Sequence, residues 1–126
     1  MPALAPRAVI FDLDGTLVDS ERVYGQALAR QEADHVLGAL GLVDAFELRL
    51  CAEDVARSKP APDGYLAACA SLGVAPHDAV VIEDSASGIA AGRAAGCAVI
   101  AVRAGNFSGQ DQSAAHLVVD TLDEIT

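Results

Sequence analysis

The stretch "DAVVIEDSASGIAAGRAAGCAVIAV", residues 78–102, decides the fold expected for this chain. Its first part, 78–84, is a short apolar run typical of a buried strand, and 98–102 is a second run of the same kind. Between them, residues 85–96 form a helical pattern that ends at a glycine. Strands that are apolar on both faces and alternate with helices indicate a parallel sheet covered on both sides. The stretch therefore predicts the α/β class.

The segments on either side extend this alternation. The expected strands lie at 7–14, 46–52 and 116–120, and the expected helical segments at 20–41 and 61–73. The second of these helices begins at Pro62 and ends at Gly73. The segment 104–115 is expected to be an ordinary polar loop. With 126 residues, the chain is expected to be a single domain, 1–126, built on a doubly wound, Rossmann-like parallel sheet.

Composition and charge exclude several classes of partner. Hydrophobic residues make up 52% of the chain, and 18 acidic side chains against 8 basic ones give a net charge of −10. This balance argues against nucleic acids and anionic membranes as partners, but not against small phosphorylated molecules. No segment approaches the roughly 20 apolar residues of a membrane span, and the first residues make a poor signal peptide. We therefore expect a cytoplasmic protein.

Several residue types that often carry chemistry are expected here to be structural. Three cysteines lack metal-ligand spacing and lie in apolar surroundings, which predicts small buried residues. These are Cys51, Cys69 and Cys97. Three histidines lie far from any motif and are expected to be structural or exposed. These are His35, His77 and His116. Gly88 and Gly92 are expected to let their helix pack closely on the sheet, with no role in chemistry.

Polar side chains follow three of the expected strands. Asp12 and Asp14 follow the first, Lys59 comes shortly after 46–52, and Glu83 and Asp84 follow 78–84. Ligands bind beyond the carboxyl ends of the strands in such sheets, so these side chains should share one edge. Two like unit charges about 4 Å apart repel each other by roughly 4 kcal/mol at an effective dielectric near 20. Because one lysine offsets only one of the four carboxylates, a further cation is needed. An all-oxygen site of this kind suits Mg²⁺.

The sequence "DLDGT", residues 12–16, fits phosphoryl transfer. Asp12 and Asp14 are two residues apart and face the same side of an extended segment, and Gly15 lets the chain turn and expose backbone N–H groups to an anion. One aspartate would be the nucleophile, and the other would move a proton. Alternatively, the aspartates cap a turn at the strand end, and Lys59 is a solvated lysine before a helix.

Three motifs in order resemble one family. The segments "FDLDGTLVDS", "SKPAPDGY" and "VIEDSASGIAAGRAAG" are similar to the haloacid dehalogenase superfamily of phosphohydrolases, in the branch of phosphoglycolate phosphatase and β-phosphoglucomutase. The resemblance implies that Asp12 forms an aspartyl phosphate and that Asp14 is the acid and base. It also implies that Lys59 neutralises the phosphoryl oxygens.

The resemblance further implies a set of ligands. Mg²⁺ would be held by the Asp12 carboxylate, the Asp14 carbonyl and Asp84, with Glu83 as a ligand or beside one. The substrate phosphoryl group would be bound by residues of the first motif and by the lysine. These are Asp12, Leu13, Asp14, Gly15, Thr16 and Lys59.

The chain departs from that branch between Asp14 and Lys59. A helical cap domain and a strand ending in Ser or Thr are expected there, and neither is recognisable. The sequence reads as if two helices join near residues 31–34, so we expect the cap to be absent from this chain. A segment omitted from the chain, a deliberate deletion and a natural loss would each explain the join.

Four functions are weighed. The favoured one is a Mg²⁺-dependent phosphohydrolase acting on a small phosphorylated metabolite such as a sugar phosphate or phosphoglycolate. A β-phosphoglucomutase-like phosphomutase and a non-catalytic relic of the family are the alternatives. A response-regulator receiver domain has similar chemistry, but it carries its lysine on the last strand, whereas Lys59 precedes Glu83 and Asp84.

Overall fold

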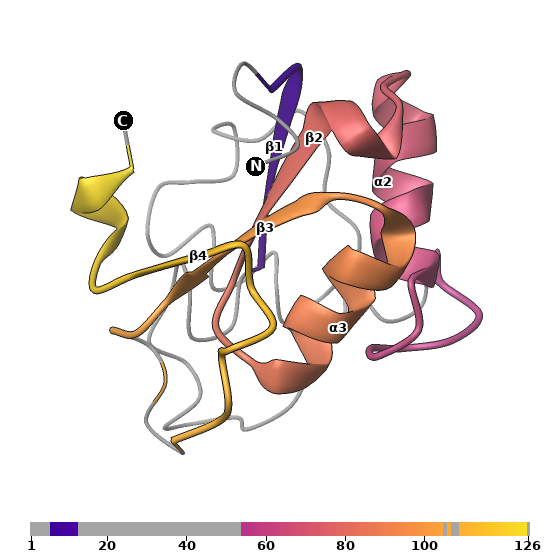
Figure 1. Cartoon of the computed structure of the whole chain (residues 1–126). Helices are drawn as coiled ribbons and strands as arrows, with labels where there is room; N and C mark the ends of the chain where they lie inside the picture. The colour runs from indigo at the N-terminus through magenta and orange to yellow at the C-terminus, as the bar shows by residue number, and fades with distance from the viewer. Residues whose placement is uncertain (1–5, 13–53, 105, 107–108, 126) are drawn as a thin grey trace, which may run out of the picture.

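The computed structural model describes residues 6–12, 54–104, 106 and 109–125. Within these residues the strands form one parallel sheet in the order β1-β2-β3-β4 (Figure 1). The strands are β1 (Ala8–Phe11), β2 (Ala79–Glu83), β3 (Ala98–Val102) and β4 (Leu117–Val119). The helices are α2 (Asp63–Leu72) and α3 (Ala86–Ala95), with short 3-10 helices η3 (Pro76–Asp78) and η4 (Leu122–Glu124).

The two inner strands are buried along their whole length. Every residue of β2 and of β3 is buried, because each strand has a neighbour on both sides and apolar contacts on both faces. This explains why the sequence shows continuous apolar runs there rather than an alternating pattern. The α/β class predicted from the sequence is confirmed.

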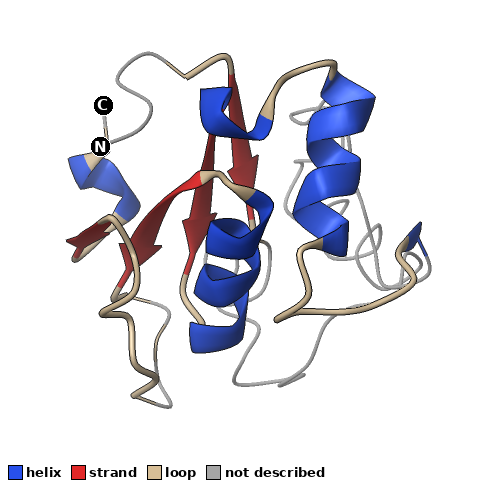
Figure 2. Cartoon of the chain, turned by 45° about the vertical axis from the view of Figure 1, so that its right-hand side comes forward, coloured by secondary structure: helices blue, strands red, loops and turns tan. Residues whose placement is uncertain are grey.

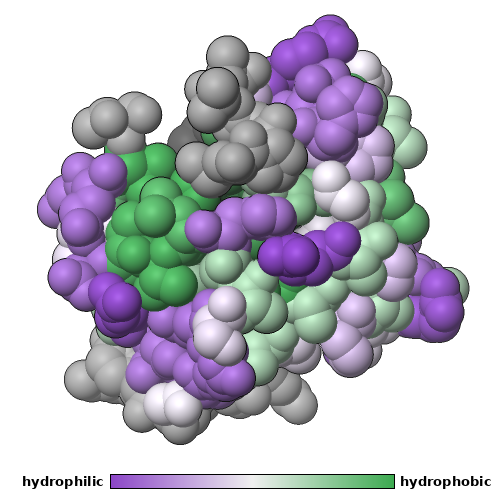
Figure 3. Space-filling view, viewed as in Figure 1, coloured by the Kyte–Doolittle hydropathy of each residue, from purple (hydrophilic) through white to green (hydrophobic). Residues whose placement is uncertain are grey.

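Helices α2 and α3 pack side by side on the same face of the sheet (Figure 2). Tyr65 and Cys69 of α2 join Ile89 of α3 in one core cluster with Val81 and Val99 of the sheet. The opposite face carries a second cluster, to which η4 contributes Leu122 and, just beyond it, Ile125. In Figure 3 hydrophobic residues gather on the side of the molecule that carries η4. Both faces of the sheet are therefore apolar, as a doubly wound sheet requires.

The helix ends are set by a serine cap and by two glycines, and the glycines are those that the sequence indicated. Ser85 caps α3, since its Oγ accepts a hydrogen bond from the Gly88 N–H at 3.0 Å. Gly96 ends α3 with φ 90°, and Gly73 ends α2 with φ 69°. Both glycines adopt the left-handed conformation that closes a helix and that other residues resist.

Most of the expected elements agree with the structure. The strands expected at 7–14, 78–84, 98–102 and 116–120 correspond to β1 to β4, and the helices expected at 61–73 and 85–96 correspond to α2 and α3. The remaining predictions concern the strand at 46–52, the helical segment at 20–41, the join near 31–34 and the cap, all of which lie outside the described residues. No helix of the described segments is long and apolar enough to cross a membrane.

The described cysteines are buried and the described histidines are structural or exposed, as predicted. Cys69 and Cys97 are buried free thiols whose Sγ atoms lie 4.0 Å apart, and burial raises the pKa of Cys97 to about 12. The His116 Nδ1 accepts a hydrogen bond from the Val99 N–H at 2.9 Å, and burial together with the charge of Arg93 lowers the pKa of His116. His77 is exposed. Cys51 and His35 lie outside the described residues.

Candidate active site

Three carboxylates meet at the carboxyl edge of the sheet. Asp12 directly follows β1, Glu83 ends β2, and Asp84 follows it. The strands are paired so that Phe11 lies opposite Ile82, and the Asp12 N–H donates to the Ile82 carbonyl at 3.0 Å. One oxygen from each carboxylate can be chosen so that all three lie within 4.8 Å of one another. The strand-end rule thus brings together the residues that the sequence singled out.

Lys59 reaches this edge from the segment before α2. Its Nζ donates a hydrogen bond to Asp12 Oδ1 at 2.8 Å and a second, short one to Glu83 Oε2. About a third of the lysine side chain is exposed, at 37%, whereas Asp12 is 14% exposed and Glu83 fully buried. Among the described residues the lysine is therefore the cation of this cluster, and its Nζ lies between two carboxylates.

Glu83 is held through both of its carboxylate oxygens. Oε1 accepts from the Asp84 N–H at 3.1 Å, from the Ser85 N–H at 3.4 Å and from the Ser85 hydroxyl at 3.3 Å. Oε2 accepts from Lys59 and from the hydroxyl of Tyr65. A buried carboxylate with this many donors is fixed in place. Glu83 is thereby better suited to holding the lysine than to binding an ion directly.

The pKa values of the cluster reflect burial first and the neighbouring charges second. Burial and then the charge of Glu83 raise the pKa of Asp12 well above its ordinary value, and Lys59 offsets only part of this. Burial lowers the pKa of Lys59, but the carboxylates of Asp12 and Glu83 outweigh burial and bring it well above its ordinary value. The amine is therefore an ammonium at neutral pH.

The cluster fits a hard divalent ion. Asp12 and Asp84 are neighbours, and contact between their carboxyl groups contributes to the raised pKa of Asp12. Two adjacent carboxylates with oxygen as the only donor atom match the preference of Mg²⁺, which usually takes one or two carboxylates and keeps several waters. Among the described residues, Asp12 and Asp84 are therefore the best candidates for metal ligands.

Two residues of the site were missed or misread in the sequence. Tyr65 received no role there, although it stands one turn into the helix that follows Lys59; its ring centroid lies 5.2 Å from the Lys59 Nζ. Gly88 was expected to serve packing alone. A Cβ on Gly88 would lie 2.0 Å from the carboxyl carbon of Glu83, so this glycine makes room for a carboxylate of the site. Gly92 is a packing residue as predicted, since its Cβ would lie 2.8 Å from Val99 Cγ2.

Part of the first motif lies beyond the described residues. Six residues, five of them in this motif and the sixth Lys59, were predicted to bind the phosphoryl group. The structure describes two of the six, Asp12 and Lys59. The roles expected for the others therefore stay predictions. These are Leu13, Asp14, Gly15 and Thr16.

The fold and the site together define an α/β protein with an acidic cluster and a lysine at the carboxyl edge of a parallel sheet. A sequence profile of the family described as haloacid dehalogenase-like hydrolase matches residues 26–102. The chain belongs to this family, and the resemblance seen in its three motifs is confirmed.

Individual relatives agree with the family. The chain is 40% identical over 94 residues to hexitol phosphatase A of Escherichia coli, covering 75% of this chain and 42% of that protein. It is 36% identical over 102 residues to beta-phosphoglucomutase of Bacillus subtilis, covering 81% of this chain and 43% of that protein. The structure of CbbY from Rhodobacter sphaeroides in complex with phosphate is similar with a TM-score of 0.67 and 27% identity, over 82% of this chain and 49% of that one. The chain thus spans less than half the length of these relatives.

Proposed function

We propose that this chain carries the core of a Mg²⁺-dependent phosphohydrolase that acts on a small phosphorylated metabolite of the sugar phosphate or phosphoglycolate type. The observation that carries the proposal is the 2.8 Å contact between the Lys59 Nζ and Asp12 Oδ1, beside Glu83 and Asp84. A carboxylate held by an ammonium at an acidic edge is suited to meet a phosphoryl group. The similarity to relatives such as hexitol phosphatase A supports this substrate class.

In the proposed reaction, Asp12 is the nucleophile. Its carboxylate oxygen forms a bond to phosphorus while the bond from phosphorus to the alcohol oxygen breaks, and the alcohol takes a proton from Asp14. Water then attacks the phosphorus of the aspartyl phosphate and gives a proton to Asp14. The bond between Asp12 and phosphorus breaks, so phosphate is released and the Asp12 carboxylate is restored. Lys59 keeps its proton throughout and offsets the negative charge that gathers as the carboxylate approaches the phosphoryl oxygens.

The proposal assigns the other site residues in the same way. Asp12, Asp84 and the Asp14 carbonyl hold Mg²⁺, and the backbone from Leu13 to Thr16 binds phosphoryl oxygens. When bound, the ion supplies positive charge to the phosphoryl group as a Lewis acid. Glu83 stays beside the ligands and fixes Lys59, because both of its oxygens accept hydrogen bonds already.

Hydrolysis of p-nitrophenyl phosphate by the full chain in the presence of Mg²⁺ tests the proposal. Asp12→Asn keeps the shape of the side chain but removes the nucleophile, so the rate should fall by about a thousandfold or more. Asp123→Asn, an exposed position in η4, is the matched control and should keep the rate of the unchanged chain. Equal rates for the Asp12 variant and the unchanged chain would remove the proposed function.

A phosphomutase is the second candidate, and the similarity to beta-phosphoglucomutase favours it. It would use the same aspartyl phosphate but return the phosphoryl group to a sugar. Release of free phosphate from a sugar phosphate separates the two: a hydrolase releases it with each turnover, whereas a mutase needs a bisphosphate and releases little. A chain that binds Mg²⁺ but releases no phosphate from p-nitrophenyl phosphate or from a sugar phosphate would be a non-catalytic relic.

We further propose that residues 1–126 form a single core domain and that the protein works in the cytoplasm. The described part of the chain has one sheet with its two faces packed, which supports the first statement. The second is supported by the free thiols of Cys69 and Cys97, since paired cysteines are usual in oxidising compartments.

A further inference from the structure

The loop after β3 contains a buried polar side chain that the sequence did not distinguish. Segment 104–115 was expected to be an ordinary polar loop, yet Gln112 is only 8% exposed. Its Nε2 donates one hydrogen bond to the Asp84 carbonyl at 2.8 Å and another to the Val102 carbonyl at 2.9 Å. Asp84 follows β2 and Val102 ends β3, so one amide group joins the ends of two neighbouring strands.

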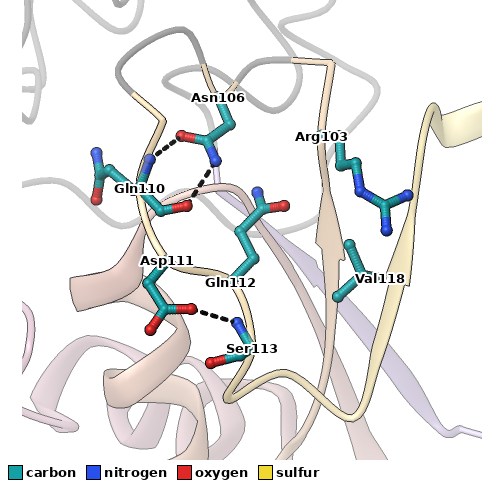
Figure 4. A pocket seen from close by; sticks show the side chains of 7 residues that line it. All are labelled: Arg103, Asn106, Gln110, Asp111, Gln112, Ser113 and Val118. Atoms are coloured by element: carbon teal, nitrogen blue, oxygen red, sulfur yellow. Dashed lines mark hydrogen bonds between the residues drawn. The ribbon is translucent and has the colours of Figure 1, made fainter.

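The loop itself is braced around this side chain. Asn106 and Gln110 exchange two hydrogen bonds of 2.8 Å, and the Ser113 N–H donates to Asp111 Oδ1 at 2.9 Å (Figure 4). These residues and Gln112 line an open hollow of about 500 Å³, and Gln112 is the most buried of its lining residues. The local bonds on both sides of Gln112 restrict the positions that its backbone can take.

A second glutamine of the loop contacts the backbone two residues after Asp84. Gln110 Oε1 accepts a hydrogen bond from the Ala86 N–H at 2.9 Å, at the first residue of α3. The loop therefore contacts the backbone at residues 84 and 86. It donates a hydrogen bond to the carbonyl of residue 84 and accepts one from the N–H of residue 86. Both contacts are neutral, so they fix the turn between β2 and α3 without adding charge to the acidic cluster.

The chemistry of the bond explains why a glutamine is needed. Two backbone carbonyls face the Gln112 position, and a neutral side chain can satisfy both only if it carries two N–H donors, as a carboxamide does. A buried carbonyl left without a donor is unfavourable. Removing the amide takes away the donor that Gln112 supplies to the Asp84 carbonyl, and it should therefore let the Asp84 backbone move.

We propose that Gln112 is a positioning residue for the metal site: its amide holds the Asp84 carbonyl against the end of β3 and so fixes the backbone that places the Asp84 carboxylate beside Asp12. The inference rests on the proposed function, because it takes Asp84 to be a Mg²⁺ ligand. Groups that hold a ligand from behind change metal affinity although they never touch the ion.

Titration of the full chain with Mg²⁺ by calorimetry tests the proposal. Gln112→Met keeps the length of the side chain but has no donor, and it should weaken Mg²⁺ binding by about tenfold. Ser113→Ala, an exposed neighbour in the same loop whose backbone N–H keeps its bond to Asp111, is the matched control and should bind as the unchanged chain does. Raising the Mg²⁺ concentration should restore p-nitrophenyl phosphate hydrolysis in Gln112→Met, which a merely unfolding variant would not show.

The outcomes separate this inference from the proposed function. If the unchanged chain binds Mg²⁺ and Gln112→Met binds it equally well, the positioning role is overturned and the proposed function stands. If the unchanged chain binds no Mg²⁺, both are overturned. Should Gln112→Met fail to fold, NMR of the unchanged chain decides: the Gln112 side-chain amide signals should shift when Mg²⁺ is added, and those of Asn106 should shift far less. Unmoved Gln112 signals beside a shifted Asp84 amide would overturn the inference.

Discussion

The two sides of the Glu83–Asp84 pair are held by different kinds of interaction. On the side of β1, Glu83 faces the ammonium of Lys59 and the hydroxyl of Tyr65, and the same lysine reaches Asp12. On the side of β3, the Asp84 carbonyl faces the neutral amide of Gln112. On the first side, a charged amine and a hydroxyl contact the carboxylates of side chains. On the second side, an uncharged amide contacts a backbone carbonyl.

This difference separates two tasks. A positive charge that neutralises a phosphoryl group has to lie beside the place where that group binds. On the side of β1, the ammonium of Lys59 between two carboxylates is in such a place. The backbone that carries a metal ligand needs a fixed position and no added charge, because another cation there would compete with the ion. A carboxamide supplies this, since it offers two donors and stays neutral. The comparison predicts that removing the ammonium of the charged side has the largest effect, and that removing a neutral group has a smaller one.

The largest effect is expected from Lys59→Met. Asp12 and the buried Glu83 then lose the ammonium that lies between them, so the rate of phosphate ester hydrolysis should fall by about a hundred- to thousandfold. Because Glu83 is fully buried and loses its charged partner, the free energy of unfolding should fall by about 3 kcal/mol, measured by urea denaturation.

Arg57→Met is the matched control for the lysine. Arg57 forms an ion pair with Asp63 at 2.8 Å just before α2, but its side chain is 71% exposed. Exposed pairs contribute little, so neither the rate nor the denaturation midpoint should change measurably. Equal effects of the two substitutions would mean that the charged side is an ordinary surface ion pair, and the comparison would be wrong.

A smaller effect is expected where the two sides meet. In Gly88→Ala the new Cβ would lie 2.0 Å from the Glu83 carboxyl carbon, so the carboxylate or helix α3 has to move. Overpacking of this kind should lower the free energy of unfolding by about 2–3 kcal/mol. In the control, Gly64→Ala, the nearest heavy atom of the described residues to the new Cβ is Val55 Cγ1 at 3.8 Å, and stability should stay equal or rise. Thermal unfolding of both variants measures the difference; a Gly88 variant as stable as the Gly64 variant would contradict the close contact.

The smallest effect is expected from Tyr65→Phe. It removes the hydroxyl that donates to Glu83 but keeps the ring beside the Lys59 Nζ. Since Glu83 Oε2 still accepts from Lys59, the loss should be about 1.5 kcal/mol in the free energy of unfolding, the lower end for a hydrogen bond to a charged group. Tyr65→Leu, which also removes the ring, should cost more. If Tyr65→Phe and the unchanged chain unfold at the same urea concentration, the hydroxyl does not support the charged side.

The sequence was informative where chemistry follows from local pattern. The continuous apolar runs of β2 and β3 predicted inner strands, and the glycines at 73 and 96 marked the helix ends that the structure has. The rule that ligands meet at the carboxyl ends of parallel strands brought Asp12 and Lys59 into one hypothesis, although 47 residues separate them in the chain.

The sequence was silent where a role depends on which atoms approach across the fold. Gln112 and Asp84 are 28 residues apart, and nothing in "GQDQS", residues 109–113, distinguishes the buried glutamine from its neighbours. Gly88 carried a signal for close packing, but the partner in that contact, a carboxylate of the site, could not be read from a helical pattern.

By itself, then, the sequence determined the α/β class, the family, and which carboxylates and which lysine stand at strand ends, because hydrophobic periodicity and the order of motifs are properties of the chain. Only the tertiary structure decided how these groups share their partners: Lys59 between Asp12 and Glu83, and Gln112 behind Asp84. Hydrogen bonds and ion pairs depend on distances of a few ångströms between segments far apart in the chain, and folding fixes those distances.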